Sequence, residues 1–342
     1  MKILFMFSKN IEIKKSKIMS SVLRENIFVP NSTLINGISY KTPQGQMLWS
    51  EGYSFNNLHQ TTERKTYSVL DSAKIEKFNY NAKTQALELG PISAEVKNSI
   101  KRSNGYMEEL KDLNIGFVSK QVASIDSTVM YYDAFGKFRG ACVFKKDCLM
   151  KIDDDHYSWN QGILSVVRVD DVPVTFSYKG RSYPIITDKI GSVRGLVSSD
   201  GNQLYFTRNY GPYGEKTVTI NTQLSPEQQK QAKELEKLLI WGFAGLIELP
   251  WKVGEYSDAR LYISQSRVYS PDAREWVSPD NYVKWNPQAA ITTPWDLQPL
   301  RYTRNQPLDF IDPTGVQGRG CLGLSKRWKK RIVCCRSSFL FC

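Results

Sequence analysis

Short units in which an aromatic residue ends an apolar run and a glycine soon follows recur along this chain, and they constrain its fold more than any other feature. The clearest unit, Tyr131–Phe138, reads YYDAFGKF, and similar units occupy residues 40–49, 157–167 and 176–183. Glycine tolerates the positive φ of a tight turn, and a nearby Asp or Asn can bond the turn backbone. Aromatic and β-branched neighbours favour a half-buried strand surface. The units therefore predict stacked β-hairpins.

The composition agrees with a mainly β fold. Aromatic residues make up 12% of the 342 residues, and 22 Gly and 15 Pro suit short strands separated by turns better than a helical bundle. Hydrophobic residues make up 41%, which is enough for a sizeable core. A chain of this length can hold one large domain or two ordinary ones.

Two segments are expected to be short helices within this β framework. Residues 91–101 form one candidate. The other begins at Ser225, a typical N-cap residue, which is followed by Pro226 and an acidic first turn. Leu235, Leu238 and Leu239 form an apolar stripe, so we expect this helix to pack on the core and to end before Gly242.

The positive charge is concentrated at the C-terminal end. The net charge is +12, and residues 317–342 contain seven Lys or Arg but no Asp or Glu. The rest of the chain is only mildly basic and has no basic stripe interleaved with aromatic residues, so no nucleic-acid partner is expected for the body. The run KRWKKR at residues 326–331 is expected to be a solvated charge run, with contact to a membrane or nucleic acid as the alternative.

Cysteine and histidine usage gives little support for a metal site. Of the six cysteines, four lie in the last 22 residues, no CxxC pair occurs, and the two histidines, His59 and His156, are distant from that tail. We expect no metal and no cofactor.

No apolar run approaches the roughly 18 residues that a membrane span needs. The short apolar start has no convincing cleavage site, so no signal peptide is expected.

A series of motifs occupies residues 184–316. In chain order they read DKIGSVR at 188–194, YGPYGE at 210–215, GFAG at 242–245, RVYSP at 267–271 with WVSPD at 276–280, and YTRNQPLDFIDPTG at 302–315. Together they resemble the core segment of rearrangement-hotspot (Rhs) proteins, the tyrosine-aspartate (YD) repeat family. The order of five motifs makes the match specific. The upstream aromatic–turn units resemble degenerate YD repeats.

This resemblance implies a fold and a division of the chain. Proteins of the family form a long, hairpin-rich β-sheet that spirals into a hollow shell. The core curls inward and plugs one end, and the shell encloses a variable C-terminal polypeptide, usually a toxin. The expected segments are a basic irregular leader at 1–24, degenerate repeats at 25–183, the core at 184–316 and a basic, Cys-rich variable tail at 317–342. That tail is too short for an ordinary enzymatic toxin domain.

The resemblance also implies an aspartic self-cleaving site. It maps onto Arg267, Asp280 and Asp312, with the scissile bond between Val316 and Gln317. Two close carboxylates can share a proton and act as base and acid on a water, and an arginine can hold one of them charged. The sequence departs from the family where Val316 replaces Leu. Turn capping by Asp280 and Asp312 is the alternative interpretation.

Partners and location follow only from the resemblance. They are the rest of a larger shell or delivery complex and an immunity protein for the tail, in a secreted or cell-surface setting. Two alternatives stay open at this point. The Tyr- and Trp-rich β surface is also compatible with a cell-surface module that binds carbohydrate or protein, and the chain is also compatible with a truncated remnant that has no function.

Overall fold

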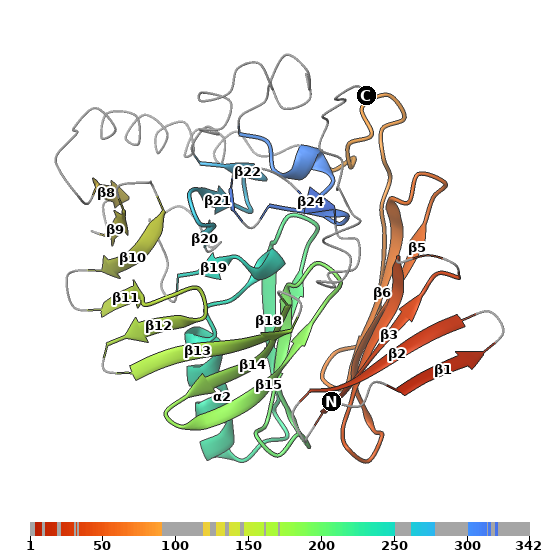
Figure 1. The fold of residues 1–342 in the computed structure, drawn as a ribbon, viewed down its shortest axis with the longest axis horizontal. Helices are drawn as coiled ribbons and strands as arrows, with labels where there is room; N and C mark the ends of the chain where they lie inside the picture. The colour runs from red at the N-terminus through yellow and green to blue at the C-terminus, as the bar shows by residue number, and fades with distance from the viewer. Residues whose placement is uncertain are drawn as a thin grey trace, which may run out of the picture.

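The protein is described from a computed structural model, shown in Figure 1. The described residues are 4–8, 11–18, 22–30, 32, 34–90, 119–123, 128–133, 137–143, 147–160, 162–169, 172–249, 261–277, 300–312, 314–315 and 319–320. The helix expected at residues 91–101 lies outside them. In the described part the fold is mainly antiparallel β, as the sequence predicts.

The first sheet is a seven-stranded antiparallel meander in which every strand pairs with its neighbour in the sequence. It consists of β1 (Leu4–Ser8), β2 (Ile11–Ile18), β3 (Val22–Phe28), β4 (Ile35–Lys41), β5 (Met47–Phe55), β6 (Thr61–Ser68) and β7 (Lys74–Lys77). Such a strict order needs only hairpin connections between strands.

The N-terminal segment differs from its expected irregular structure. Residues 1–24 contain β1, β2 and the first residues of β3. In β2 and β3 the pairing runs from Glu12 opposite Phe28 to Ile18 opposite Val22. Apolar residues alternate with polar ones at Ile11 and Ile13, which favours a strand even within a lysine-rich sequence.

The second sheet is an eleven-stranded antiparallel meander, also in strict chain order. It consists of β8 (Ser119–Ala123), β9 (Thr128–Tyr132), β10 (Phe138–Val143), β11 (Asp147–Lys151), β12 (His156–Trp159), β13 (Gly162–Val169), β14 (Val172–Tyr178), β15 (Arg181–Thr187), β16 (Val193–Val197), β17 (Leu204–Tyr210) and β18 (Lys216–Ile220). The expected boundary between residues 183 and 184 falls inside β15, and the sheet is continuous across it. The division into four segments stays a prediction.

The predicted hairpins are confirmed. The units at residues 40–49, 131–138, 157–167 and 176–183 correspond to the β4–β5, β9–β10, β12–β13 and β14–β15 pairs. Gly45 and Gly180 have φ values of 89° and 73° in their turns, a conformation that favours glycine. Next to one of these hairpins, Cys142 and Cys148 lie opposite each other on β10 and β11 and form a disulfide.

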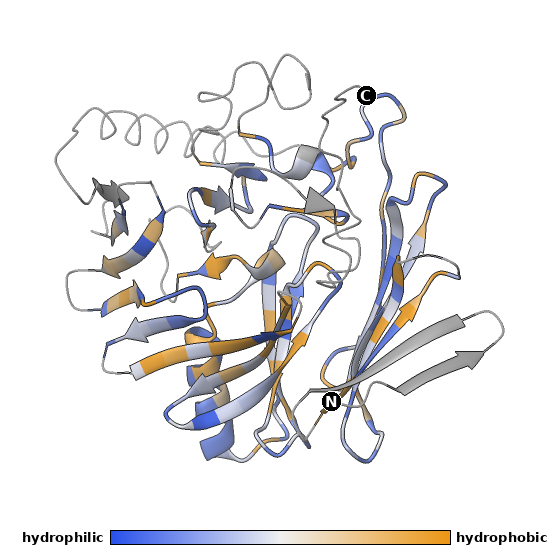
Figure 2. Ribbon diagram, in the orientation of Figure 1, coloured by the Kyte–Doolittle hydropathy of each residue, from blue (hydrophilic) through white to orange (hydrophobic). Residues whose placement is uncertain are grey.

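The predicted helix is confirmed as α2 (Pro226–Leu238). The Ser225 side chain accepts a hydrogen bond from the Gln228 backbone, and the Gln228 side chain accepts one from the Ser225 backbone, which completes a capping box. The expected stripe is buried, and α2 packs on β17 and β18 of the second sheet. Figure 2 shows apolar residues along the strands of that sheet, while much of α2 is hydrophilic.

Short elements follow α2 and lie beside the ends of the large sheets (Figure 1). They are η1 (Phe243–Gly245), β19 (Ile247–Glu248), β20 (Tyr262–Ile263), β21 (Val268–Ser270), β22 (Glu275–Trp276), η3 (Thr303–Asn305), β23 (Phe310–Ile311) and β24 (Arg319–Gly320). The strands β19 to β22 form a small antiparallel sheet, and β23 pairs with β24. No helix in the described ranges is long and apolar enough to cross a membrane.

The two large sheets pack against each other through an apolar cluster. From the first sheet, Tyr40 and Trp49 are fully buried, and from the second sheet Ile186 and Val197 are fully buried in the same cluster. Alternate residues of the second sheet point to its other face, where Trp241 and α2 cover them. The second sheet is therefore buried on both faces near β15 and β16.

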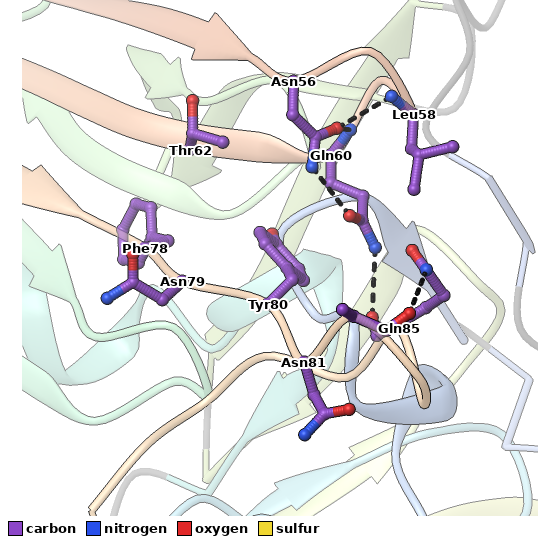
Figure 3. A pocket seen from close by; sticks show the side chains of 10 residues that line it. Asn56, Leu58, Gln60, Thr62, Phe78, Asn79, Tyr80, Asn81 and Gln85 are labelled. Carbon is purple, nitrogen blue, oxygen red and sulfur yellow. Dashed lines mark hydrogen bonds between the residues drawn. The ribbon is translucent and has the colours of Figure 1, made fainter.

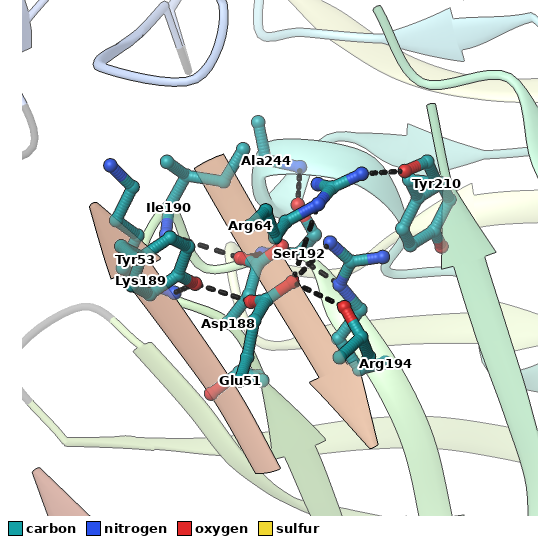
Figure 4. A network of polar contacts seen from close by, with 12 residues as sticks. Glu51, Tyr53, Arg64, Asp188, Lys189, Ile190, Ser192, Arg194, Tyr210 and Ala244 are labelled. Atoms are coloured by element: carbon teal, nitrogen blue, oxygen red, sulfur yellow. Dashed lines mark hydrogen bonds and ion pairs between the residues drawn. The ribbon is translucent and has the colours of Figure 1, made fainter. Parts of the chain in front are cut away.

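A buried network of charges joins the sheets beside this apolar contact (Figure 4). Arg194 on β16 donates to Glu51 on β5 at 3.1 Å and to Asp188 at 3.0 Å. On the first sheet, Arg64 lies 3.6 Å from Glu51 and donates to the Tyr210 carbonyl at 2.6 Å. Each cation therefore touches groups from both sheets, which fixes the sheets relative to each other.

A second polar contact ties the sheets at Asp71, which follows β6. Thr207 on β17 and Thr219 on β18 each donate to its carboxylate at 2.6 Å. Burial by itself raises the pKa of Asp71, but hydrogen bonds from Thr207, Thr219, Ser68 and Asn209 outweigh it, so the pKa lies below its usual value of 3.8. The charged form of Asp71 is therefore favoured in the folded protein.

This contact predicts a pH-dependent difference between the wild-type protein and Asp71→Asn. Because the pKa of Asp71 is lowered by folding, its stabilising effect is complete above pH 3.8 and is lost as the pH falls through the lower folded-state pKa. The urea midpoint of the wild type should exceed that of Asp71→Asn at pH 7. The gap should narrow below pH 3.8, and a gap that widens there would contradict the assignment.

Candidate self-cleavage site

The sequence motifs of residues 184–316 converge on one buried aromatic cluster. Its rings come from segments that are distant in the sequence. Within residues 184–316 they belong to Tyr210, Tyr213, Phe243, Tyr262, Tyr269, Trp276 and Tyr302, and Phe78 adds a ring from outside these motifs. The rings of Tyr269 and Tyr302 have centroids 4.4 Å apart, and Tyr269 lies 5.6 Å from Trp276 in an edge-to-face arrangement. These motifs therefore build the interior that supports the site.

Polar residues of the motifs fix the turns around this cluster. Asp188 accepts hydrogen bonds from the Ile190 and Ser192 backbones at 3.1 and 2.8 Å, which closes the turn that leads into β16. The Ser192 hydroxyl accepts one from the backbone of Ala244, at 3.0 Å. Two motifs that are 52 residues apart are thus bonded directly. These residues have a structural role in the turn and in the sheet contact.

Burial changes the acidity of Asp188 in this turn. Burial raises the pKa of Asp188 above its usual value, and the neighbouring Glu51 carboxylate acts in the same direction, while Arg194 opposes them. The same burial lowers the pKa of Arg194, but Glu51 and Asp188 raise it more strongly, so the guanidinium stays charged. The ion pair between Arg194 and these carboxylates is therefore the electrostatic centre of the contact between the sheets.

Two of the three predicted site residues meet in the structure. The Arg267 Nη2 atom donates to the Asp312 Oδ2 atom at 3.1 Å, and both residues are buried, with exposed fractions of 4% and 3%. The Arg267 guanidinium also lies over the Trp276 ring, 4.3 Å from its centroid. A buried arginine at this distance favours the charged form of a carboxylate.

The second oxygen of Asp312 organises the turn that follows it. The Oδ1 atom accepts a hydrogen bond from the Gly315 backbone at 3.0 Å and lies 3.4 Å from the Thr314 hydroxyl. Gly315 has a φ of 72°, and a Cβ atom there would collide with Ser264. The Ser266 hydroxyl donates to the Thr314 carbonyl at 2.7 Å. The backbone is therefore held in place just before Val316.

The remaining predicted residues lie outside the described ones. These are Asp280 and both sides of the expected scissile bond, Val316 and Gln317. The structure thus places one carboxylate, its arginine and the turn that precedes the bond. Catalysis by a carboxylate pair needs a second carboxyl group to share the proton, so Asp280 keeps its role only as a prediction.

Sequence reasoning missed three contributors to this site. Trp276 lies under the guanidinium of Arg267, while Ser264 and Ser266 shape the turn around it. The Ser264 hydroxyl accepts a hydrogen bond from the Arg267 backbone at 2.9 Å. The spacing of Ser264 and Arg267, three residues apart, is typical of a side-chain-closed turn and was the available signal. Within the described ranges no three His, Cys, Asp or Glu residues group as metal ligands.

Comparison with known proteins gives a likeness in fold. No family model and no curated protein matches the sequence. The crystal structure of TcdB2-TccC3-TEV matches 92% of this chain with a TM-score of 0.59 at 12% identity, and that of TcdB2-TccC3-Cdc42 matches 91% with a TM-score of 0.49 at 13% identity. This chain spans 19% of the length of each. At 12% identity, the first match supports the Rhs-like β fold that the sequence predicts.

Proposed function

We propose that this chain is part of a β-shell scaffold that encloses or presents a C-terminal polypeptide, and that it cuts itself after Val316. The likeness in fold to a TcdB2-TccC3 chain supports the scaffold. The observation that carries the cleavage is the buried contact of 3.1 Å between Arg267 and Asp312, next to a turn that leads directly into Val316.

In this proposal each residue has its own part, and the contacts of Arg267 and Gly315 with Asp312 support it. Arg267 donates to one oxygen of Asp312 and the Gly315 backbone donates to the other, and together they fix the orientation of that carboxylate. With a proton on Asp280, the two carboxyl groups would serve as base and acid for a water that attacks the carbonyl of Val316. The water adds its oxygen to that carbonyl carbon and the nitrogen of Gln317 leaves with a proton, which hydrolyses the bond.

The rest of the assembly is also part of the proposal. The chain spans a fifth of the length of the structure that it matches, so further shell strands would complete the enclosure. Its partners would be the remainder of a larger shell or delivery complex and an immunity protein for the tail. A secreted or cell-surface setting fits this role.

Intact-mass spectrometry of the purified full chain tests self-cleavage. The wild type should give fragments that end at Val316 and begin at Gln317. Asp312→Asn removes the carboxylate and should leave the chain whole or slow its cleavage roughly 10²–10⁴-fold. Arg267→Met should also slow cleavage, because Asp312 loses its charged partner.

Asp309→Asn is the matched control. Asp309 lies three residues before Asp312 in the same strand–turn region, but it contacts Lys189 and Thr61 rather than Arg267. Cleavage should therefore continue in this variant. A wild-type chain that stays whole, or an Asp312→Asn chain that is cut at the wild-type rate, would contradict the proposed reaction.

A further inference from the structure

A cavity of about 460 Å³ lies at one end of the first sheet (Figure 3). One wall is the turn between β5 and β6, and the other is the segment that follows β7. The volume falls within the usual range for pockets that bind small ligands. The cavity is separate from the Arg267–Asp312 site, and its residues have no part in the proposed cleavage.

The lining of this cavity is polar but uncharged. Five of its ten lining residues carry side-chain amides, and they are Asn56, Gln60, Asn79, Asn81 and Gln85. The cavity also contains two aromatic side chains and no charged one. Each amide offers an acceptor oxygen and two N–H donors within one group. This chemistry suits a ligand with many neutral hydroxyl groups and gives no counter-charge for a phosphate, sulfate or carboxylate.

Hydrogen bonds hold the first wall in position. The Asn56 oxygen accepts from the Leu58 and Gln60 backbones at 2.9 and 3.0 Å, and its amide nitrogen donates to the Gln60 side chain at 2.9 Å. The Gln60 amide nitrogen in turn donates to the Gln85 carbonyl at 3.0 Å, across the cavity. The two walls are therefore tied together, and the cost of ordering them on binding is small.

The aromatic side chain of Tyr80 is fixed in the same way. Its hydroxyl lies 3.1 Å from the Thr61 carbonyl and 3.0 Å from the Asp309 carboxylate. Because Thr61 and Asp309 hold the hydroxyl, the Tyr80 ring keeps its position among the amide side chains that line the cavity (Figure 3). An aromatic face gives apolar area and weak C–H contacts to a flat ligand, at little entropic cost because few torsions are restricted.

Other amide groups keep hydrogen-bonding capacity for a ligand. Asn79 is exposed, and among the described contacts its side chain makes no hydrogen bond. The side-chain nitrogen of Gln85 donates to the Ala82 carbonyl at 3.1 Å, and among the described contacts its side-chain oxygen accepts no hydrogen bond. Rigid amides on one wall and available amides on the other form a site with fixed geometry and spare donors and acceptors.

We propose that this cavity binds a neutral saccharide of one or two rings. The amides would pair with its hydroxyl groups, and Tyr80 would contact an apolar face of a ring. A polar peptide is the competing ligand. It is disfavoured because extended peptides usually bind by pairing with a strand edge, whereas turns and side chains form this cavity.

Isothermal titration of the full chain with lactose, maltose, cellobiose and N,N′-diacetylchitobiose tests the proposal. At least one of these sugars should bind with a dissociation constant of about 1 mM or lower. Asn79→Ala and Gln85→Gly should each weaken that binding about tenfold, the effect of a lost hydrogen bond. Glycine suits position 85 because Gln85 has a φ of 58°.

Asn57→Ala is the matched control. Asn57 belongs to the turn between β5 and β6 that forms the first wall and is exposed, but it does not line the cavity, so this variant should bind as the wild type does. Asp312→Asn should also bind normally, which separates this result from that of the cleavage test. The proposal is overturned if no neutral sugar binds, if Asn79→Ala and Gln85→Gly bind as tightly as wild type, or if sialyllactose or a Gly-Ser tetrapeptide binds more tightly than every neutral sugar.

Discussion

The Arg194→Met variant is expected to lose about 3–5 kcal/mol of its free energy of unfolding. Arg194 is almost fully buried and contacts two carboxylates, Glu51 at 3.1 Å and Asp188 at 3.0 Å. Removing the guanidinium leaves both carboxylates inside the protein without this cation. Arg64 still lies 3.6 Å from Glu51, but Asp188 loses the guanidinium that donates to it. The cost of leaving that buried carboxylate without its donor exceeds the gain from the apolar methionine side chain.

Urea unfolding followed by circular dichroism measures this loss. Arg139→Met provides the matched control, because Arg139 pairs with Asp133 at 3.0 Å while half of its side chain is exposed. Solvent screens that pair, so its removal should cost at most about 1 kcal/mol. Equal losses in the two variants would show that the buried network does not hold the sheets together.

Trp241→Ala is expected to have a comparable effect through a different mechanism. Trp241 is fully buried between the second sheet and α2, and its ring meets those of Tyr157 and Phe176 at centroid distances of 5.8 and 6.3 Å. Truncation to alanine would leave a large cavity and remove both ring contacts. Such changes cost about 3–5 kcal/mol, which the same urea experiment would measure.

Trp241→Phe separates the contribution of the ring from that of the indole nitrogen. In the described part of the chain, the Trp241 N–H makes no hydrogen bond. Phenylalanine keeps an aromatic ring and removes this unsatisfied donor, so Trp241→Phe should lower the free energy of unfolding clearly less than Trp241→Ala does. If both variants lost the same stability, the ring contacts with Tyr157 and Phe176 would not be the source of the effect.

Local sequence signals were sufficient for the elements that neighbouring residues determine. The hairpin at residues 176–183 turns at Lys179 and Gly180, which both adopt positive φ, and aromatic residues lie on either side of them. The helix α2 begins where Ser225 and Gln228 form a capping box, a pattern that spans four residues. In both cases the physical cause and the sequence signal lie within the same short segment.

The contacts between the sheets were not predictable in this way. Glu51 lies on β5 between Trp49 and Tyr53, all three on the same buried face. From the local sequence alone, a carboxylate at such a position is expected to interrupt an apolar face of the strand. Its partner Arg194 is 143 residues away, so only the tertiary structure shows that the charge is compensated.

The candidate site falls between these two cases. Arg267 and Asp312 are 45 residues apart, and nothing in composition or periodicity brings them together. The resemblance to Rhs proteins named both residues, and the structure places them in contact. Trp276 was missed as a partner of Arg267 because a tryptophan in such a sequence usually indicates a core residue. Here its ring packs in the buried aromatic cluster and also contacts the guanidinium of Arg267.

Hydrogen–deuterium exchange of the full chain tests most directly whether the two large sheets form one scaffold. If they do, the slowest amides of β4 and β5 and those of β15 and β16 share one opening free energy, because neither sheet opens without the other. Arg194→Met should lower the opening free energy of the amides in both sheets by the same amount. Exchange that stays slow in one sheet while the other opens, in the wild type or in this variant, would contradict a single scaffold.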